Sequence, residues 1–122
     1  MPIECREGAQ AVRQALRNAP ADVRLEGATR LSDCLVRSSD AADLQAVGAA
    51  FLDVASELSV AAKREPGGLE AVQLGYLRGA VLHGADAGVH DELVRRIEQE
   101  LIGVDTRSPA FRRGEARGRA GG

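Results

Sequence analysis

The feature that most constrains the fold is a run of apolar residues spaced three and four positions apart between Asp40 and Pro66. Such spacing places side chains on one face of an α-helix that packs at a shallow angle against neighbours, as in a bundle. The run consists of Leu44, Val47, Phe51, Val54, Leu58 and Ala61. We therefore expect a helix over 40–64, with Ser38, Ser39 or Asp40 as candidates for its N-cap.

Four further segments carry apolar residues at helical spacing, at about 6–19, 22–37, 69–84 and 89–104. No stretch alternates with a period of two for long enough to form a strand. Only two Phe and one Tyr supply aromatic rings, and there is no Trp, so the core must consist of Leu, Val and Ala. The sequence predicts an all-α protein, a compact and mostly antiparallel bundle of about five helices.

The segment 69–84 is the most apolar of the five and is expected at the centre of the bundle. Gly75, Gly79 and Gly84 lie close to a single line along it. Glycine costs about 1 kcal/mol in a helix interior. Three glycines on one line therefore predict a close helix crossing, at which a Cβ would collide.

Charge is distributed unevenly along the chain. Residues 1–104 carry eleven basic and sixteen acidic side chains, a balance of −5, whereas 105–122 carry five Arg, one Asp and one Glu, a balance of +3. We expect a folded domain over 1–104 and a flexible Arg/Gly-rich tail over 105–122. Nucleic acid is not expected as a partner, except through this tail, because the acidic body would repel a polyanion.

Cys5 and Cys34 are the only cysteines, 29 positions apart and without CxxC spacing. This pattern indicates neither a zinc site nor a disulfide framework. The N-terminal residues lack a basic region followed by an apolar stretch, and no run of eighteen uninterrupted apolar residues occurs. We expect a cytoplasmic protein without a membrane span, in which both cysteines are reduced.

Both histidines lie between the last two predicted helices. His83, Asp86 and His90 are spaced by three and four positions, so they would share one face of a continuous helix. Two imidazoles and a carboxylate can bind a divalent metal ion. Gly84 and Gly88 favour a break in that helix, after which the shared face is lost. A metal site and a polar corner between helices are the two alternatives.

Arg78 and His83 form an R-x4-H motif late in the predicted helix 69–84. In a small all-α protein this motif resembles the signature of the HEPN ribonucleases, helical bundles that act as dimers. The resemblance implies RNA cleavage at a dimer interface, with His83 handling the proton and Arg78 the phosphate. The chain departs from the family pattern at Gly79, where a polar residue is usual, and at Ala85, where a tyrosine is frequent.

Other signatures of catalysis are missing from the sequence. It contains no Walker sequence, no nucleophile elbow and no close set of inward-facing acids, so no cofactor is predicted. The sequence favours a protein–protein interaction or assembly module over an enzyme. The broad apolar faces of 40–64 and 69–84 favour self-association into a homodimer. The HEPN-like ribonuclease and the metal site are the alternatives.

Overall fold

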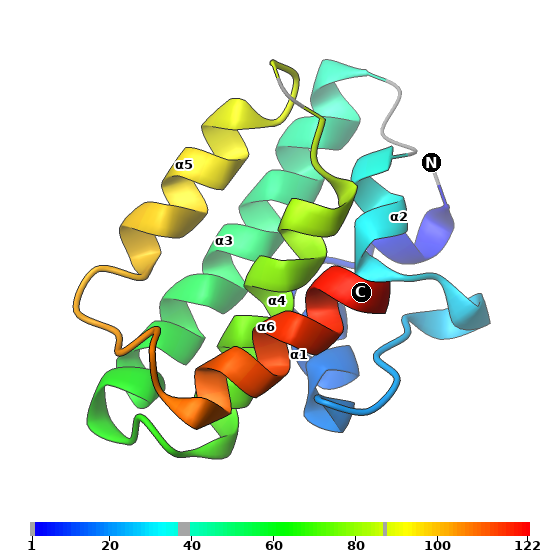
Figure 1. The fold of residues 1–122 in the computed structure, drawn as a ribbon. Coiled ribbons are helices and arrows are strands. Elements are labelled where there is room, and N and C mark those ends of the chain that lie inside the picture. The colour runs from blue at the N-terminus through cyan, green and yellow to red at the C-terminus, as the bar shows by residue number, and fades with distance from the viewer. Residues whose placement is uncertain (1, 37–39, 87) are drawn as a thin grey trace.

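The computed structural model describes residues 2–36, 40–86 and 88–122. Over these ranges the regular secondary structure is all helical, with no strand, which confirms the predicted all-α fold (Figure 1). The α-helices are α1 (Ala9–Ala15), α2 (Leu31–Val36), α3 (Ala41–Arg64), α4 (Leu69–Gly84), α5 (Asp91–Glu100) and α6 (Pro109–Gly121), and the 3-10 helices are η1 (Ile3–Arg6), η2 (Leu16–Asn18) and η3 (Glu26–Ala28).

The two longest helices begin and end close to where the sequence places them. Asp40 is the N-cap of α3, and its Oδ1 accepts a hydrogen bond from the Asp43 N–H at 2.8 Å. The other N-cap candidates, Ser38 and Ser39, and the last position of the predicted segment 22–37 lie outside the described residues. α4 packs against α2, α3, α5 and α6, so it is the central helix, as predicted (Figure 1).

The core lies between these helices and is built largely from leucine and valine, together with both phenylalanines. The largest side chains with less than 2% exposure are Phe51, Phe111, Leu16, Leu31, Leu35, Leu58, Leu74, Leu77, Ile97, Val23, Val47 and Val54. Among the described residues, α3 alone is long and apolar enough to cross a membrane by length and composition. Core helices of globular proteins pass the same test, and α3 directs Phe51 and Val54 into this core.

The predicted helix 22–37 is only partly helical, because α2 covers just its last part. Gly27 and Ala28 have φ angles of 72° and 66°, in the left-handed region that a right-handed helix cannot contain. Val23 and Leu25 are nevertheless buried. The apolar residues in the first part of this stretch therefore reflect burial of an irregular segment and not a helix face.

The first and fifth predicted helices are shorter than expected. Gly8, with φ of 88°, precedes α1, and the segment predicted as 6–19 continues from α1 into the 3-10 turn η2. The segment predicted as 89–104 is helical only over α5. Leu101 and Val104 are buried in the turns that follow, so they extended the apolar pattern beyond the helix.

The segment 105–122 was expected to be a flexible tail, but the structure contains a helix, α6, that packs across α4 (Figure 1). Ser108 caps this helix, its Oγ accepting from the Phe111 N–H at 3.1 Å, and Pro109 occupies the first turn. Phe111 is 1% exposed and belongs to the core. The helix carries few large apolar residues, and its Gly114 and Gly118 lie directly against the backbone of α4.

The predicted close crossing along α4 is confirmed, with α6 as the helix that crosses. A Cβ on Gly75 or Gly79 would overlap a backbone carbonyl oxygen of α6. A Cβ on Gly114 or Gly118 would overlap a carbonyl oxygen of α4. The two backbones therefore touch directly. Gly84 makes a similar approach to α2, where a Cβ would lie 2.8 Å from a carbonyl oxygen.

The expectation of two reduced cysteines is wrong for this structure, because Cys5 and Cys34 form a disulfide. It joins η1 to α2, with the two Cα atoms 5.5 Å apart. Both cysteines are buried. Only the separation of the two cysteines along the chain can be read from the sequence, whereas a disulfide requires that folding bring the two Cβ atoms together.

Candidate functional site

Arg78 of α4 links three helices. Its Nε donates to Glu98 of α5 at 2.7 Å, and its Nη1 donates to Glu115 of α6. Its side chain is 23% exposed. Burial alone would lower the pKa of Arg78, but the hydrogen bonds to Glu98 and Glu115 outweigh this effect and raise it above the ordinary value. The guanidinium of the R-x4-H motif is therefore held by two carboxylates of its own chain.

His83, the second residue of that motif, is exposed in the last turn of α4. Its Nδ1 lies 2.7 Å from the carbonyl oxygen of Arg119. A carbonyl only accepts, so Nδ1 donates in this contact, which satisfies one of the last carbonyls of α6. Both Arg78 and His83 thus contact α6. The HEPN-like ribonuclease suggested by the motif stays a prediction.

The three residues considered as metal ligands have separate contacts. His90 is buried, and its Nδ1 accepts from the backbone N–H of Asp86 at 2.8 Å. The backbone N–H of His90 in turn donates to the Asp86 carbonyl at 3.0 Å. His83 is directed to α6 instead. No three His, Cys, Asp or Glu side chains within 2–36, 40–86 and 88–122 gather to hold a metal ion. In the described geometry His83 and His90 each form a hydrogen bond with a backbone group, and the metal site stays a prediction.

A groove of about 500 Å³ lies between α3 and the start of α5. These two helices lie side by side and run in the same direction (Figure 1). Apolar side chains of Leu44, Leu52 and Leu93 line the groove, and Gly48 leaves space there, since a Cβ on it would reach only Leu93, at 3.7 Å. Val89, at the start of the groove, is 63% exposed. We call this surface the α3–α5 groove.

Charged side chains complete the lining of the α3–α5 groove, among them Asp53, Glu92 and Arg96. Glu92 is exposed and accepts two hydrogen bonds from Nη2 of Arg95, at 2.7 and 2.8 Å. The hydrogen bond from Arg95 lowers the pKa of Glu92, so this carboxylate is ionised at neutral pH. Apolar and charged contacts are therefore available on one surface.

The sequence did not predict this groove. Leu52 lies beside the core seam of α3, where it is only partly buried and lines the groove. One usable signal was present. Ala41, Gln45, Gly48 and Leu52 follow each other by four, three and four positions, which defines a second stripe beside the core seam.

Comparison with known proteins gives no match to a protein family, to a curated protein or to a solved structure. The candidate site is defined by the geometry of the chain itself.

Proposed function

We propose that this chain is a protein-interaction module that acts by binding, and that two copies associate through the α3–α5 groove. The observation that carries the proposal is the exposed apolar side chain of Val89 on the edge of an apolar groove. A surface that holds both a projection and a hollow can bind a copy of itself about a two-fold axis. In such a dimer, Val89 of each copy lies in the partner's groove, against Leu44 and Leu52.

The charges on the same surface also favour a second copy as the occupant. Glu92 and Arg96 both line the groove and are four positions apart, so they share one face of α5. If two α5 helices lie antiparallel about a two-fold axis, Glu92 of each copy faces the partner's Arg96. Two identical ion pairs form, so the surface is complementary to itself in charge as well as in shape.

The size of the surface sets the expected strength of the dimer. Eleven residues line the groove, whereas a stable interface uses about 20–30 residues on each side. Exposed ion pairs contribute little binding free energy, so they orient the copies more than they hold them together. We therefore expect a weak dimer, with a Kd of roughly 10–50 µM.

Sedimentation equilibrium over a wide concentration range tests the proposal. The weight-average mass should rise with protein concentration from the monomer value of 12.8 kDa toward twice that value. Val89→Glu should weaken the dimer by about tenfold or more, because it places a charge in an apolar groove. Val60→Glu is the matched control, since Val60 is 52% exposed on α3 and does not line the groove. It should leave the Kd unchanged.

Mixing two charge variants tests the two-fold arrangement. Glu92→Arg alone and Arg96→Glu alone each place like charges opposite one another and should be monomeric. An equimolar mixture should form a heterodimer, because the two basic side chains of each Glu92→Arg chain then face two acidic side chains of the Arg96→Glu chain. Wild-type protein that stays monomeric near 500 µM, a concentration about tenfold above a micromolar-range Kd, would contradict self-association. A mixture that stays monomeric while the wild type dimerises would place the interface elsewhere.

A further inference from the structure

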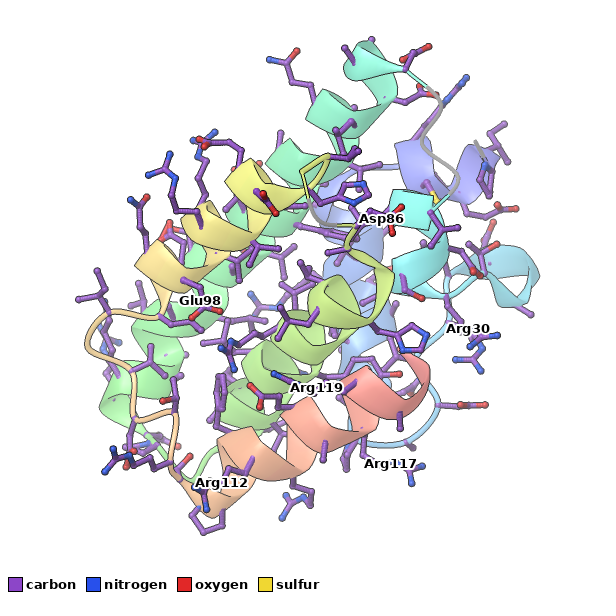
Figure 2. All side chains as sticks on the ribbon, turned by 45° about the horizontal axis from the view of Figure 1, so that its top comes forward. Arg30, Asp86, Glu98, Arg112, Arg117 and Arg119 are labelled. Carbon is purple, nitrogen blue, oxygen red and sulfur yellow. A yellow bond between two sulfur atoms is a disulfide. The ribbon has the colours of Figure 1, made fainter. Side chains whose placement is uncertain are left out.

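A second concave surface lies where the 19–30 segment passes the C-terminal half of α6, and three arginines line it. This pocket, of about 330 Å³, is lined by Arg24, Arg30 and Arg117, with Asp22 as its only acid. Figure 2 shows Arg30 and Arg117 on the side of the molecule where this segment meets α6. We propose that this basic pocket binds a tetrahedral dianion of the phosphate type, either free phosphate or a phosphomonoester. It shares no lining residue with the α3–α5 groove.

Backbone carbonyls hold two of the three guanidinium groups at the edge of the basic pocket. Nε of Arg117 donates to the carbonyl of Pro20 at 3.2 Å, which joins α6 to the 19–30 segment. Nη1 of Arg24 donates to the carbonyl of Val23 at 3.0 Å. A guanidinium has five N–H donors, and each of these contacts uses one. The remaining N–H groups are those that a tetrahedral oxyanion would engage, often two at a time.

The charges around the basic pocket favour an anion. Asp22 lies 3.4 Å from Nη2 of Arg24, but its side chain is 83% exposed, so water screens this pair strongly. Neither Arg30 nor Arg117 forms an ion pair with a carboxylate of the described residues. Asp33, three positions beyond Arg30, accepts from its backbone N–H instead. Three cations against one exposed anion leave a net charge of +2.

Shape and the remaining lining favour a small ligand over a long polyanion. Tyr76 of α4, 3% exposed, adds a side chain with an O–H donor to the lining. Pockets near 300 Å³ suit small ligands. Arg112 and Arg113 are exposed on α6 but do not line the basic pocket. A nucleic-acid backbone would use these two arginines as well, whereas a single phosphate group would not reach them.

Nuclear magnetic resonance titration with inorganic phosphate and with phenyl phosphate tests the proposal. Saturable chemical-shift changes should appear in the 19–30 segment and in the second half of α6. Added salt should weaken the binding that causes them. Arg30→Gln should raise the Kd about fivefold or more, because it removes one charge-assisted contact. Arg30 is exposed, so the substitution should leave the fold intact, and circular dichroism checks this point. Arg113→Gln, on the same helix as Arg117 but outside the pocket, should change the Kd less than about twofold.

The two titrants distinguish the source of the phosphate group. Tighter binding of phenyl phosphate supports a phosphomonoester, and tighter binding of inorganic phosphate supports the free ion. Two results would overturn the proposal. One is the absence of saturable shifts up to about 20 mM of either titrant, beyond the range of a specific site. The other is an equal loss of affinity in Arg30→Gln and Arg113→Gln, with an oligonucleotide binding more tightly than phosphate, which would assign the whole α6 surface to nucleic acid.

Discussion

The guanidinium of Arg78 lies between carboxylates that belong to two other helices, Glu98 on α5 and Glu115 on α6. These carboxylates are 42% and 21% exposed, so water reaches both sides of the cluster. Solvent access reduces the free energy that such pairs contribute below that of a fully buried pair. One side chain, that of Arg78, thus connects both α5 and α6 to the central helix. Removing it breaks both ion pairs at once.

Arg78→Met removes the charge and keeps an aliphatic stem. We expect the free energy of unfolding to fall by about 1–2 kcal/mol, because Glu98 and Glu115 lose the cation that both of them share. Urea denaturation measures this change. Arg95→Met is the control, since Arg95 pairs with Glu92 at an exposed site and exposed pairs contribute less to stability than partly buried ones. An equal fall in the free energy of unfolding of the two variants would show that the Arg78 cluster stabilises the fold no more than an exposed ion pair does.

The sign of the pH dependence follows from the raised pKa of Arg78. A cation whose folded-state pKa is raised stabilises the fold fully below its unfolded-state pKa and loses that effect only as pH rises through the folded-state value. The ordinary pKa of arginine already lies far above neutral pH. The difference between wild type and Arg78→Met should therefore stay constant from neutral pH to about pH 10.

At the scale of elements, the contact between α4 and α6 is made by backbone and not by large side chains. Glycines at positions four apart on each helix, Gly75 with Gly79 and Gly114 with Gly118, let the helices approach until carbonyl groups occupy the space of the missing Cβ atoms. Backbone cannot move aside as a flexible side chain can. The position of α6 therefore depends on these four residues.

Gly114→Ala should detach α6 or destabilise the whole fold. Alanine favours a helix by about 1 kcal/mol over glycine, but overlap with the backbone of α4 should cost about 3 kcal/mol or more. Urea denaturation, with hydrogen exchange over 109–121, measures both effects. Gly121→Ala is the control on the same helix, because nothing lies within 4 Å of a Cβ there. It should be neutral or slightly stabilising. A neutral Gly114→Ala would mean that 105–122 is the flexible tail.

The elements that could be predicted from sequence are those whose packing depends on periodic large apolar residues. The seam from Leu44 to Ala61 defined α3, and the proline and glycines that follow it marked where α4 begins. α6 has only Phe111 as a large apolar residue, so a hydrophobic pattern could not reveal it. Ser108 and Pro109 at its start, and glycines spaced by four on both helices, were the available signals.

The candidate site was less predictable than the fold. The sequence placed Arg78 and His83 late in one helix, but their contacts with α6 required that helix to be known. The α3–α5 groove depends on where α5 lies along α3, which is a property of tertiary packing. Val89 was expected inside the last predicted helix, and its exposure follows from α5 beginning only at Asp91.

At the scale of the whole molecule, both ends of the chain meet at α2. The disulfide joins Cys5 near the N-terminus to Cys34 of this helix. The backbone N–H of Ser32, also in α2, donates to the carbonyl oxygen of Gly122 at 2.9 Å. A helix of six residues has little stability alone. α2 is therefore held by contacts with segments that are distant in sequence, and the disulfide is the one covalent link among them.

Reduction of this disulfide should lower the stability of the entire fold. Its cysteines are 29 positions apart. Closing a loop of that length lowers the entropy of the unfolded chain and so raises its free energy by about 3–4 kcal/mol. Urea denaturation with and without a reductant should show a loss of this size. The Cys5→Ser/Cys34→Ser variant should be as unstable as the reduced protein and should not respond to the reductant.

Cytoplasmic proteins rarely keep such bonds, so the cytoplasmic location expected from the sequence predicts the less stable, reduced form. A thiol assay on unfolded, unreduced protein gives the outcome: no free thiols if the bond forms, and two free thiols if it does not.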